Sequence, residues 1–439
     1  MNADKADHRL NRKAQELCEK LYLAAKRSKT RRFHQLYDKV YRMDILTDSW
    51  EIVKQNKGCS GADGVNIGDV ILYGQDKYLQ ELHNTLLDTH KYHPRKIKRV
   101  YISKADGKQR LLGIPAIIDR IVQTATKILL EPIFEADFLN CSYGFRPNRS
   151  CHEALEEIRV WTNRGFKFVL DADISGYFDN INHEKLLEFV LMRISDRKIL
   201  KLIRKWLKCG VVGELWDNEV GTPQGGVISP LLANIYLHEF DKFWYTQKRV
   251  RGKLIRYADD FVILFASRND AELGLRLVNA KMTELGLTLN TEKTKIVDMR
   301  DGKEGFDFLG FQHRQSISKK YKKRYTLKFP KKESVKKLKQ AIKDKTSMRT
   351  TLVLPLEEII EGINPLLRGW MNYFKFGNST KVFHSIDSYV HERLALWLAK
   401  KHRKSGRRWK TDFTYEKYKK CGVVMMTGKI VYWSKTLNA

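Results

Sequence analysis

Tyr257-Ala258-Asp259-Asp260 is the stretch that decides the fold of this chain, because it places two adjacent carboxylates between two apolar segments. Residues 253–256 before it and residues 261–265 after it have the pattern of short strands, which predicts a hairpin with both acids in or beside its tight turn. Two anions above an apolar sheet repel each other, and a divalent cation would neutralise them. Adjacent aspartates are also common in solvated turns, so a third acid is needed to decide between the two interpretations.

The third acid comes from a strand predicted at residues 166–174. Side chains of a strand alternate between its faces, so Asp171 and Asp173 share one face. Asp173 lies near the end of the strand, where the chain turns away toward a helix predicted at 183–193. If this strand neighbours the 253–265 hairpin, three carboxylates meet at one edge of a sheet: Asp173, Asp259 and Asp260.

Such a group of acids has a specific chemistry. Hard carboxylate oxygens suit Mg²⁺, which usually takes one or two protein carboxylates together with phosphate oxygens of a substrate. Two such ions, about 3.5–4 Å apart, activate a 3′-hydroxyl and stabilise a leaving pyrophosphate. Phosphoryl transfer of this kind needs mainly positioning and charge neutralisation. The acids therefore predict a site for two Mg²⁺ ions, which Mn²⁺ can replace.

The balance of charge predicts a polyanionic partner. The 439 residues include 82 Lys and Arg against 51 Asp and Glu, which gives a net charge of +31 and a pI of about 9.7. Nucleic acid and an anionic membrane surface both fit this charge. The sequence has no run of about 18 apolar residues and starts with a polar segment, so we expect no spanning helix and no signal peptide. Nucleic acid is the favoured partner, and no membrane contact is expected.

Six cysteines are scattered along the chain, and no two of them form a Cys-x-x-Cys pair. A zinc module built on such pairs is therefore not expected. The pattern is typical of free thiols in a reducing cytoplasm.

The order of the predicted elements indicates an α+β fold. The central part is expected to run strand, helix, helix, hairpin, helix, strand, which predicts an antiparallel sheet backed by helices. Residues 319–345 contain 13 Lys and Arg against two acids, a change of composition that marks a boundary. Residues 355–400 return to a helical pattern rich in aromatic side chains, which is typical of a small helical bundle. Residues 400–439 are basic again.

Three further segments each keep two interpretations open. The hairpin predicted at 97–115 carries Lys104 and Arg110 beside its turn, where they either reach a triphosphate or serve only as surface charges. The glycine-rich loop at 221–228 either lets backbone amides approach a nucleotide or forms a tight strand-to-helix turn. The basic run at 26–32 is either a solvated helix face or a phosphate contact.

From about residue 45 to residue 400 the chain resembles the reverse transcriptase/maturases encoded by group II introns. Each matching motif alone can arise by chance, but they occur in the order of that family, and the ordered set is highly specific. The motifs are Lys104 with Arg110-Leu111-Leu112-Gly113-Ile114-Pro115, Ser142-Tyr143-Gly144-Phe145-Arg146-Pro147, Asp173-Ile174-Ser175-Gly176-Tyr177-Phe178-Asp179, Gly221-Thr222-Pro223-Gln224-Gly225-Gly226, Ser229-Pro230-Leu231-Leu232-Ala233-Asn234, Tyr257-Ala258-Asp259-Asp260, Asn290 with Lys293-Thr294, Phe308-Leu309-Gly310-Phe311 and Gly369-Trp370-Met371-Asn372-Tyr373-Phe374.

The resemblance implies a right-hand polymerase. Its expected parts are a basic helical N-terminal extension at 1–45, fingers at 46–165, a palm with an antiparallel sheet and the catalytic site at 166–316, a helical thumb that binds intron RNA at 317–400, and a short basic C-terminal tail at 401–439. The tail contains one cysteine, Cys421, so the cysteine-containing endonuclease domain of many relatives is not expected. For the N-terminal extension we hypothesise an RNA-binding helix.

The resemblance also implies roles for individual residues. Asp173 and Asp259 are the expected main metal ligands, helped by the carbonyl of Ile174, with the third catalytic acid, Asp260, close beside them. Phe178 matches the position that packs under the sugar and excludes a 2′-hydroxyl, which favours deoxynucleotides. The other expected nucleotide contacts are Lys104, Arg110, Gln224 and Lys293. The expected contacts with primer and template are Phe308, Leu309, Gly310 and Arg146. The expected RNA-binding residues of the thumb are Arg368, Trp370 and Tyr373.

These implications predict an RNA-directed DNA polymerase that is also a maturase, supporting intron splicing and target-primed retrotransposition. The expected partners are intron RNA, an RNA template with a DNA primer, deoxynucleoside triphosphates and target DNA, in a bacterial-type cytoplasm and at the nucleoid when acting on DNA. A polymerase of the same fold, recruited by the host for DNA repair or phage defence, would have a nearly identical sequence. The retained acids disfavour a non-enzymatic splicing factor, and Phe178 disfavours an RNA-dependent RNA polymerase.

Overall fold

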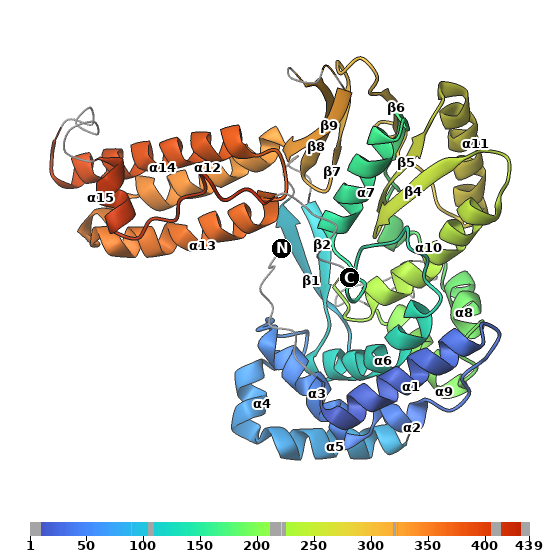
Figure 1. Ribbon diagram of the computed structural model, residues 1–439. Coiled ribbons are helices and arrows are strands. Elements are labelled where there is room, and N and C mark those ends of the chain that lie inside the picture. Colours follow the sequence, from blue (N-terminus) through green and yellow to red (C-terminus); the bar gives the residue numbers. More distant parts are fainter. Residues whose placement is uncertain are drawn as a thin grey trace.

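The computed structural model describes residues 10–88, 90–103, 109–210, 221, 225–318, 322, 324–404 and 414–431. Figure 1 shows three parts: a helical lobe at the bottom, a sheet with its helices at the right, and a helical arm that reaches to the left. Two residues with predicted roles, Lys104 and Gln224, lie outside the described residues.

The helical lobe is built around α6 (Ile117–Glu135), whose apolar positions recur at helical spacing and are buried on nearly every side. The other helices of the lobe are α1 (Arg12–Arg27), α2 (Tyr37–Val40), α3 (Met43–Gln55), α4 (Ile67–Tyr73) and α5 (Gln75–Leu87). A hairpin of β1 (Lys98–Ser103) and β2 (Gln109–Ile114) rises from the lobe, as the sequence predicted.

The first helix belongs to this lobe. Ala14, Leu21 and Ala25 of α1 are buried in the same core as α3 and α6. Asn11 caps α1 and donates from its Nδ2 to the Asp48 carboxylate of α3 at 2.8 Å. Residues 10–45 and the helices that follow them therefore share one core. Most basic side chains of residues 10–45 lie on the outer surface of the lobe.

The central sheet has four antiparallel strands in the order β4-β5-β3-β6. They are β4 (Gly252–Tyr257), β5 (Asp260–Phe265), β3 (Phe168–Ala172) and β6 (Lys295–Asp298). Phe168 lies opposite Phe265 and Ala172 opposite Phe261, so β3 pairs directly with the predicted hairpin. The α+β class and the predicted neighbourhood of these strands are confirmed.

Each face of the central sheet packs on helices. Leu170, Ile263 and Phe265 face a core shared with α10 (Ser229–Thr246) and α11 (Arg268–Glu284). On the other face, the core includes α7 (Cys151–Asn163) and the arm. The remaining elements are η1 (Tyr177–Asp179), α8 (His183–Leu191) and α9 (Arg197–Leu207), of which α9 packs on α8 next to the helical lobe.

A second sheet joins the first to the arm. It has three antiparallel strands in the order β7-β8-β9, namely β7 (Gly305–Phe308), β8 (Phe311–Ile317) and β9 (Arg324–Pro330). The arm consists of α12 (Lys332–Ser347), η2 (Arg349–Val353), α13 (Leu356–Phe374), α14 (Thr380–Lys401) and α15 (Tyr415–Lys420). Leu338, Leu367 and Phe383 from its three long helices share a core with Val262 of the central sheet, which connects the arm to the acids.

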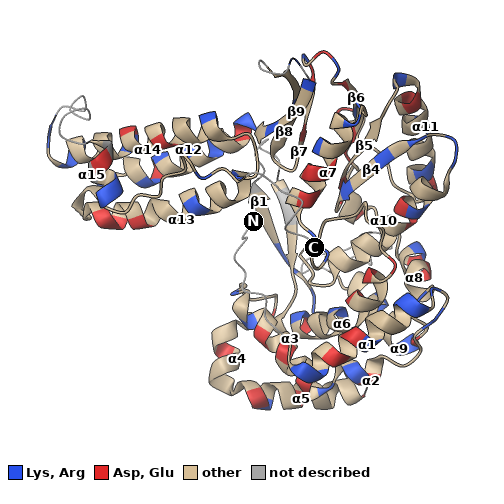
Figure 2. Ribbon diagram, viewed as in Figure 1, with Lys and Arg blue, Asp and Glu red and all other residues tan. Residues whose placement is uncertain are grey.

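Lys and Arg residues occur along every part of the ribbon (Figure 2). Helix α9 is the clearest case, because it contains no acid and exposes one basic face: Arg197, Lys198, Lys201 and Arg204. Among the described helices, none combines the length and the apolar character that crossing a membrane requires.

Candidate active site

The β4–β5 hairpin carries the two adjacent acids at the edge of the central sheet. Tyr257 pairs with Asp260, so Ala258 and Asp259 form a two-residue turn. Ala258 has a φ of 58°, in the left-handed region that residues with a Cβ rarely adopt. A positive φ at the first turn position is typical of the tight turns that match the twist of a hairpin.

Asp173 reaches the same edge from β3. The ladder between β3 and β5 ends with Ala172 opposite Phe261, and one further step of the register sets Asp173 opposite Asp260. Asp173 alternates with buried Ala172, so it lies on the face of the sheet that packs on α7. The strand order thus brings all three predicted acids to one edge.

Electrostatic repulsion concentrates at this edge. The pKa of Asp260 is raised to about 7, first because the surrounding protein displaces water from its carboxyl and then because Asp259 and Asp173 repel its negative charge. Asp171, two residues before Asp173, has its pKa raised to about 6, mainly by burial. Lys293 opposes the repulsion, since its Nζ lies 3.0 Å from Oδ2 of Asp173.

Ile174 offers a backbone oxygen to the same edge. It forms an antiparallel bridge with Leu289, in which the hydrogen bonds run from Ser175 N to Thr288 O at 2.9 Å and from Asn290 N to Asp173 O at 2.8 Å. In this type of pair the bridged residues themselves do not exchange hydrogen bonds, so the carbonyl of Ile174 points away from Leu289.

The donor set fits a hard divalent cation. Carboxylate and carbonyl oxygens are the ligands that Mg²⁺ prefers, and a bound cation would relieve the repulsion that raises the pKa of Asp260. Within the part of the chain that the structure describes, no three His, Cys, Asp or Glu side chains lie close enough together to ligate one ion. The ammonium group of Lys293 supplies the positive charge beside Asp173.

A groove of about 980 Å³ opens over the acids. Its floor is the hairpin turn, and its walls come from the lobe, the β7–β8 turn and the arm. Among the residues that line it are Phe145, Phe178, Gly225, Asp259, Asp260, Leu309, Gly310, Lys337, Trp370 and Tyr373. The predicted sugar contact, Phe178, is half-buried, and its ring packs edge-on against Tyr177 with the centroids 5.3 Å apart.

The glycine-rich loop meets the β1–β2 hairpin beside this groove. A Cβ on Gly225 would lie 2.4 Å from the carbonyl oxygen of Gly113, so only glycine fits this approach. Arg110 lies on β2 opposite Ile102, in the same hairpin. Gly225 and Gly226 also line the groove, so this part of the loop belongs to its wall.

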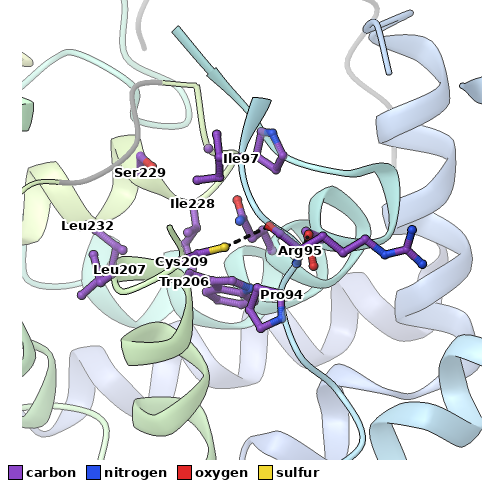
Figure 3. A pocket seen from close by; sticks show the side chains of 13 residues that line it. Pro94, Arg95, Ile97, Trp206, Leu207, Cys209, Ile228, Ser229 and Leu232 are labelled. Carbon is purple, nitrogen blue, oxygen red and sulfur yellow. Dashed lines mark hydrogen bonds between the residues drawn. The ribbon is translucent and has the colours of Figure 1, made fainter. Parts of the chain in front are cut away.

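A small pocket behind the loop explains how the loop is held (Figure 3). It lies between the base of β1, the end of α9 and the start of α10, and Cys209 donates there to the carbonyl of Arg95 at 2.9 Å. Val227 N donates to Oε1 of Gln123 at 2.9 Å, which ties the loop to α6. The residues around this pocket support the groove wall.

Arg146 was predicted to contact primer or template, and its position does not fit that role. Its guanidinium is buried and donates to Glu135 at 2.6 Å and to the carbonyls of Leu139 and Ser142 at 2.6 and 2.7 Å. All three of its nitrogens bond within the protein, as burial of a charge requires, so Arg146 supports the loop that it belongs to.

The preceding residue takes the exposed position instead. Phe145 is 48% exposed, has a φ of 55° and lines the groove with its ring centroid 6.4 Å from that of Tyr257. Sequence reasoning missed this residue, although an aromatic in a polar loop next to an arginine was a usable signal. Exposed aromatic side chains in nucleic-acid grooves commonly stack on bases.

The β7–β8 turn divides the predicted primer contacts. Phe308 is buried in the core beneath the turn, so it supports the turn and does not reach the groove. Leu309 and Gly310 line the groove, and their φ values of 47° and 76° form a tight turn of the type that joins hairpin strands. The predicted contact is therefore restricted to the turn itself.

The arm residues with predicted roles also separate. Trp370 and Tyr373 line the groove, and Tyr373 donates from its hydroxyl to the carbonyl of Leu309 at 2.7 Å. Arg368 is exposed on the surface of α13. Helix α13 thus presents aromatic groups to the groove and a cation to solvent.

Comparison with known proteins gives two family matches within this chain. Residues 102–313 match the family model described as reverse transcriptase (RNA-dependent DNA polymerase). Residues 335–414 match the model described as the group II intron, maturase-specific domain. The first match covers both sheet strands that carry the acids, and the second covers most of α12 together with η2, α13 and α14 of the arm.

Individual relatives agree with these matches. The chain is 37% identical over 336 residues to the protein YkfC of Escherichia coli, an alignment that covers 67% of this chain and 87% of that protein. It is 41% identical over 215 residues to the group II intron-encoded protein LtrA of Lactococcus lactis, covering 48% of this chain and 35% of LtrA. It is 29% identical to an uncharacterized 91 kDa protein in the cob intron of Schizosaccharomyces pombe, covering 77% of this chain and 50% of that protein.

Proposed function

Because this chain belongs to the family of group II intron-encoded reverse transcriptase/maturases and is therefore an RNA-directed DNA polymerase, we propose that Asp173, Asp259 and Asp260 are its catalytic carboxylates. The observation that supports this assignment is that the register brings all three acids to one edge of the central sheet, where Asp259 and Asp260 line the groove.

We assign separate roles to the groups at this edge. Bound divalent ions, in our proposal Mg²⁺, would supply charge neutralisation to the attacking 3′-hydroxyl and the leaving pyrophosphate. Asp173 and Asp259 would hold the ions together with the Ile174 carbonyl, and Asp260 would add negative charge beside them. Lys293, at 3.0 Å from Asp173, is placed to share its charge with nucleotide phosphates.

The groove accommodates the nucleic acids that the two domains imply, an RNA template and the DNA strand made on it. We propose that the lobe with its β1–β2 hairpin forms the fingers, the central sheet with its helices the palm, and the arm the thumb. Deoxynucleoside triphosphates enter beside Phe178, whose ring leaves no room for a 2′-hydroxyl. Phe145 and Tyr257 form a wall on which a base or sugar of the bound strands rests.

The maturase role belongs to the arm. Its helices α13 and α14 match the maturase-specific domain, and α12 exposes three lysines on one face: Lys332, Lys336 and Lys343. Such a surface binds RNA phosphates and releases counterions, so its affinity falls with salt. We propose that this face and Arg368 hold intron RNA during splicing and target-primed copying, which requires target DNA as the primer.

Primer extension on an RNA template tests the assignment. Asp259→Ala removes a proposed metal ligand, which supplies several kcal/mol, so the rate should fall by more than about 100-fold. Asp301→Ala is the matched control, because Asp301 is an exposed acid in a different turn, where it accepts a local hydrogen bond from Lys303 N at 2.8 Å and lies 3.9 Å from the ammonium of Lys303. If Asp259→Ala extends the primer as fast as Asp301→Ala, the catalytic assignment is wrong.

A further inference from the structure

Arg256 is the second-last residue of β4, just before Tyr257 and the turn. It is fully buried together with its partner on α10, Asp241. Both Arg256 and Asp241 are 0% exposed. Nε of Arg256 donates to Oδ1 of Asp241 at 2.8 Å, and Nη2 donates to Oδ2 at 2.5 Å. This two-point geometry fixes the plane of the guanidinium.

The remaining nitrogen of Arg256 reaches the catalytic turn. Its Nη1 donates to the carbonyl of Ala258 at 2.9 Å and to Oδ1 of Asn234 at 3.1 Å. Asn234, also buried on α10, donates from its Nδ2 to the carbonyl of Gly144 at 2.8 Å. One buried unit therefore binds both the turn and the loop that lies against it.

The backbone of Arg256 joins the same two segments. Its N–H donates to the carbonyl of Cys141 at 2.8 Å, and its carbonyl accepts from the N–H of Tyr143 at 2.9 Å. These bonds hold the loop that carries Phe145 parallel to β4, so the loop and the turn cannot move independently.

We propose that Arg256, Asp241 and Asn234 form a positioning clamp that sets the place of Asp259 in the groove. The proposal rests on the catalytic role proposed above for Asp259. None of the three side chains lines the groove, so the clamp acts through the Ala258 carbonyl and the Gly144 loop.

Two features of the site make a clamp necessary. Ala258 has a φ of 58°, a conformation that persists only where the surroundings determine it. Asp259 follows directly, beside acids that repel it. Without a donor on the Ala258 carbonyl, the turn has a conformational reason and an electrostatic reason to move away from its position.

The chemistry of the clamp separates positioning from packing. A buried ion pair is a costly way to fill a core, because well-packed apolar side chains often serve stability equally well. Arginine serves Asp241 at two points and the turn at a third, whereas the ammonium of lysine is a single point charge that cannot reproduce this fork. Arg256→Lys keeps the charge and removes the geometry.

Arg193 offers a matched control. It is another buried arginine, paired with Asp137 at 3.0 Å and donating to the carbonyls of Ser28 and Ala25 at 2.9 Å each, on the outer side of the lobe. Arg193→Lys disturbs another buried arginine, one that bonds mainly to main-chain carbonyls and lies away from the groove, so it reports the effect of such a change on folding alone.

The test compares steady-state primer extension and thermal melting in the full chain. A misplacement of reacting groups by about 1 Å costs about 100-fold in rate, so Arg256→Lys should lower kcat about 100-fold. Its KM for the deoxynucleoside triphosphate should stay within about twofold of the wild type, and its melting temperature should fall no further than that of Arg193→Lys. Equal kcat values for Arg256→Lys and Arg193→Lys would overturn the proposal.

A second variant keeps the test decisive if Arg256→Lys does not fold. Asn234→Ala removes the bond to Gly144 and leaves the Arg256–Asp241 pair, and kcat should fall about tenfold, as loss of an outer positioning partner typically causes; a wild-type kcat would refute the clamp. Asp259→Ala in the same assay separates the two proposals. If Asp259→Ala remains active, the proposed function is wrong. If Asp259→Ala is inactive and Arg256→Lys has the same kcat as Arg193→Lys, only the clamp is wrong.

Discussion

Replacing Gly144 by alanine should slow DNA synthesis strongly while leaving the protein folded. Gly144 lies directly against the β4–β5 turn, and a Cβ built on it would stand 2.4 Å from the backbone nitrogen of Ala258 and 2.9 Å from the carbonyl carbon of Tyr257. Both are backbone atoms, so no flexible side chain can move aside. The loop and the turn must separate.

The size of the separation follows from these distances. Ordinary van der Waals contact begins at 3.4 Å, so a Cβ at 2.4 Å requires a shift of about 1 Å. A shift of that size between reacting groups costs about 100-fold in rate, which corresponds to about 2.7 kcal/mol of activation free energy. Overpacking of the same contact should lower the free energy of unfolding by about 1–3 kcal/mol, which a chain of this size tolerates.

The assay is primer extension at saturating nucleotide, with urea unfolding of the same preparations. Gly362→Ala is the control, because Gly362 lies inside α13 with only the flexible end of Lys345 nearby, at 3.9 Å. This variant should be stabilised by about 0.5–1 kcal/mol and keep its kcat. If Gly144→Ala is destabilised yet keeps the kcat of Gly362→Ala, the turn is not coupled to the loop and the reasoning is refuted.

Two further predictions concern specificity and pH. Phe178→Ala should reduce discrimination against ribonucleotides by about 10–100-fold, measured as the ratio of kcat/KM values for matched nucleotide pairs; an unchanged ratio contradicts the sugar contact. His313 is fully buried with its pKa lowered from 6.5 to about 3, first by burial and then by Lys328. As pH falls below 6.5, this histidine is therefore protonated in the unfolded chain before it is protonated in the folded protein, which favours unfolding. Between pH 7 and pH 5 the wild type should lose about 2 kcal/mol of unfolding free energy through this group, and His313→Phe should not lose it. Urea unfolding of both proteins at the two pH values measures the difference. An equal loss in both proteins would refute this assignment.

The sheet and the position of the acids were predictable because they depend on short-range patterns. Alternation along β3 placed Asp173 on one face, and the two apolar strands around Asp259 predicted the hairpin. Strand pairing then needed only one assumption, that β3 neighbours the hairpin. Both the α+β class and the predicted edge of the sheet follow from these local signals.

The roles of arginines and aromatics were less predictable, because sequence does not reveal which way a loop side chain points. Arg146 was expected at the nucleic acid and is buried against Glu135, while its neighbour Phe145 is exposed. Phe308 was expected at the primer and lies in the core. In each case tertiary contacts with a distant helix decide the direction, and a single residue of offset exchanges the two roles.

Strain at the groove connects these observations. Among the described residues other than glycine, seven have a positive φ, and three of them line the groove: Phe145, Ala258 and Leu309. Strained residues persist where the surroundings over-determine them, and they gather at functional sites. The groove therefore depends on supports from neighbouring elements.

Each strained groove residue has such a support from a different element. The carbonyl of Ala258 accepts from Arg256 at 2.9 Å, and that of Leu309 accepts from the hydroxyl of Tyr373 at 2.7 Å. Next to Phe145, the carbonyl of Gly144 accepts from Asn234 at 2.8 Å. Because a side chain from α10, β4 or α13 holds each of these backbone segments through one carbonyl, these three elements determine the shape of the groove. Polar residues within the recognisable motifs thus divide into those that meet the substrate and those that hold the backbone beside it, and the buried donors belong to the second group.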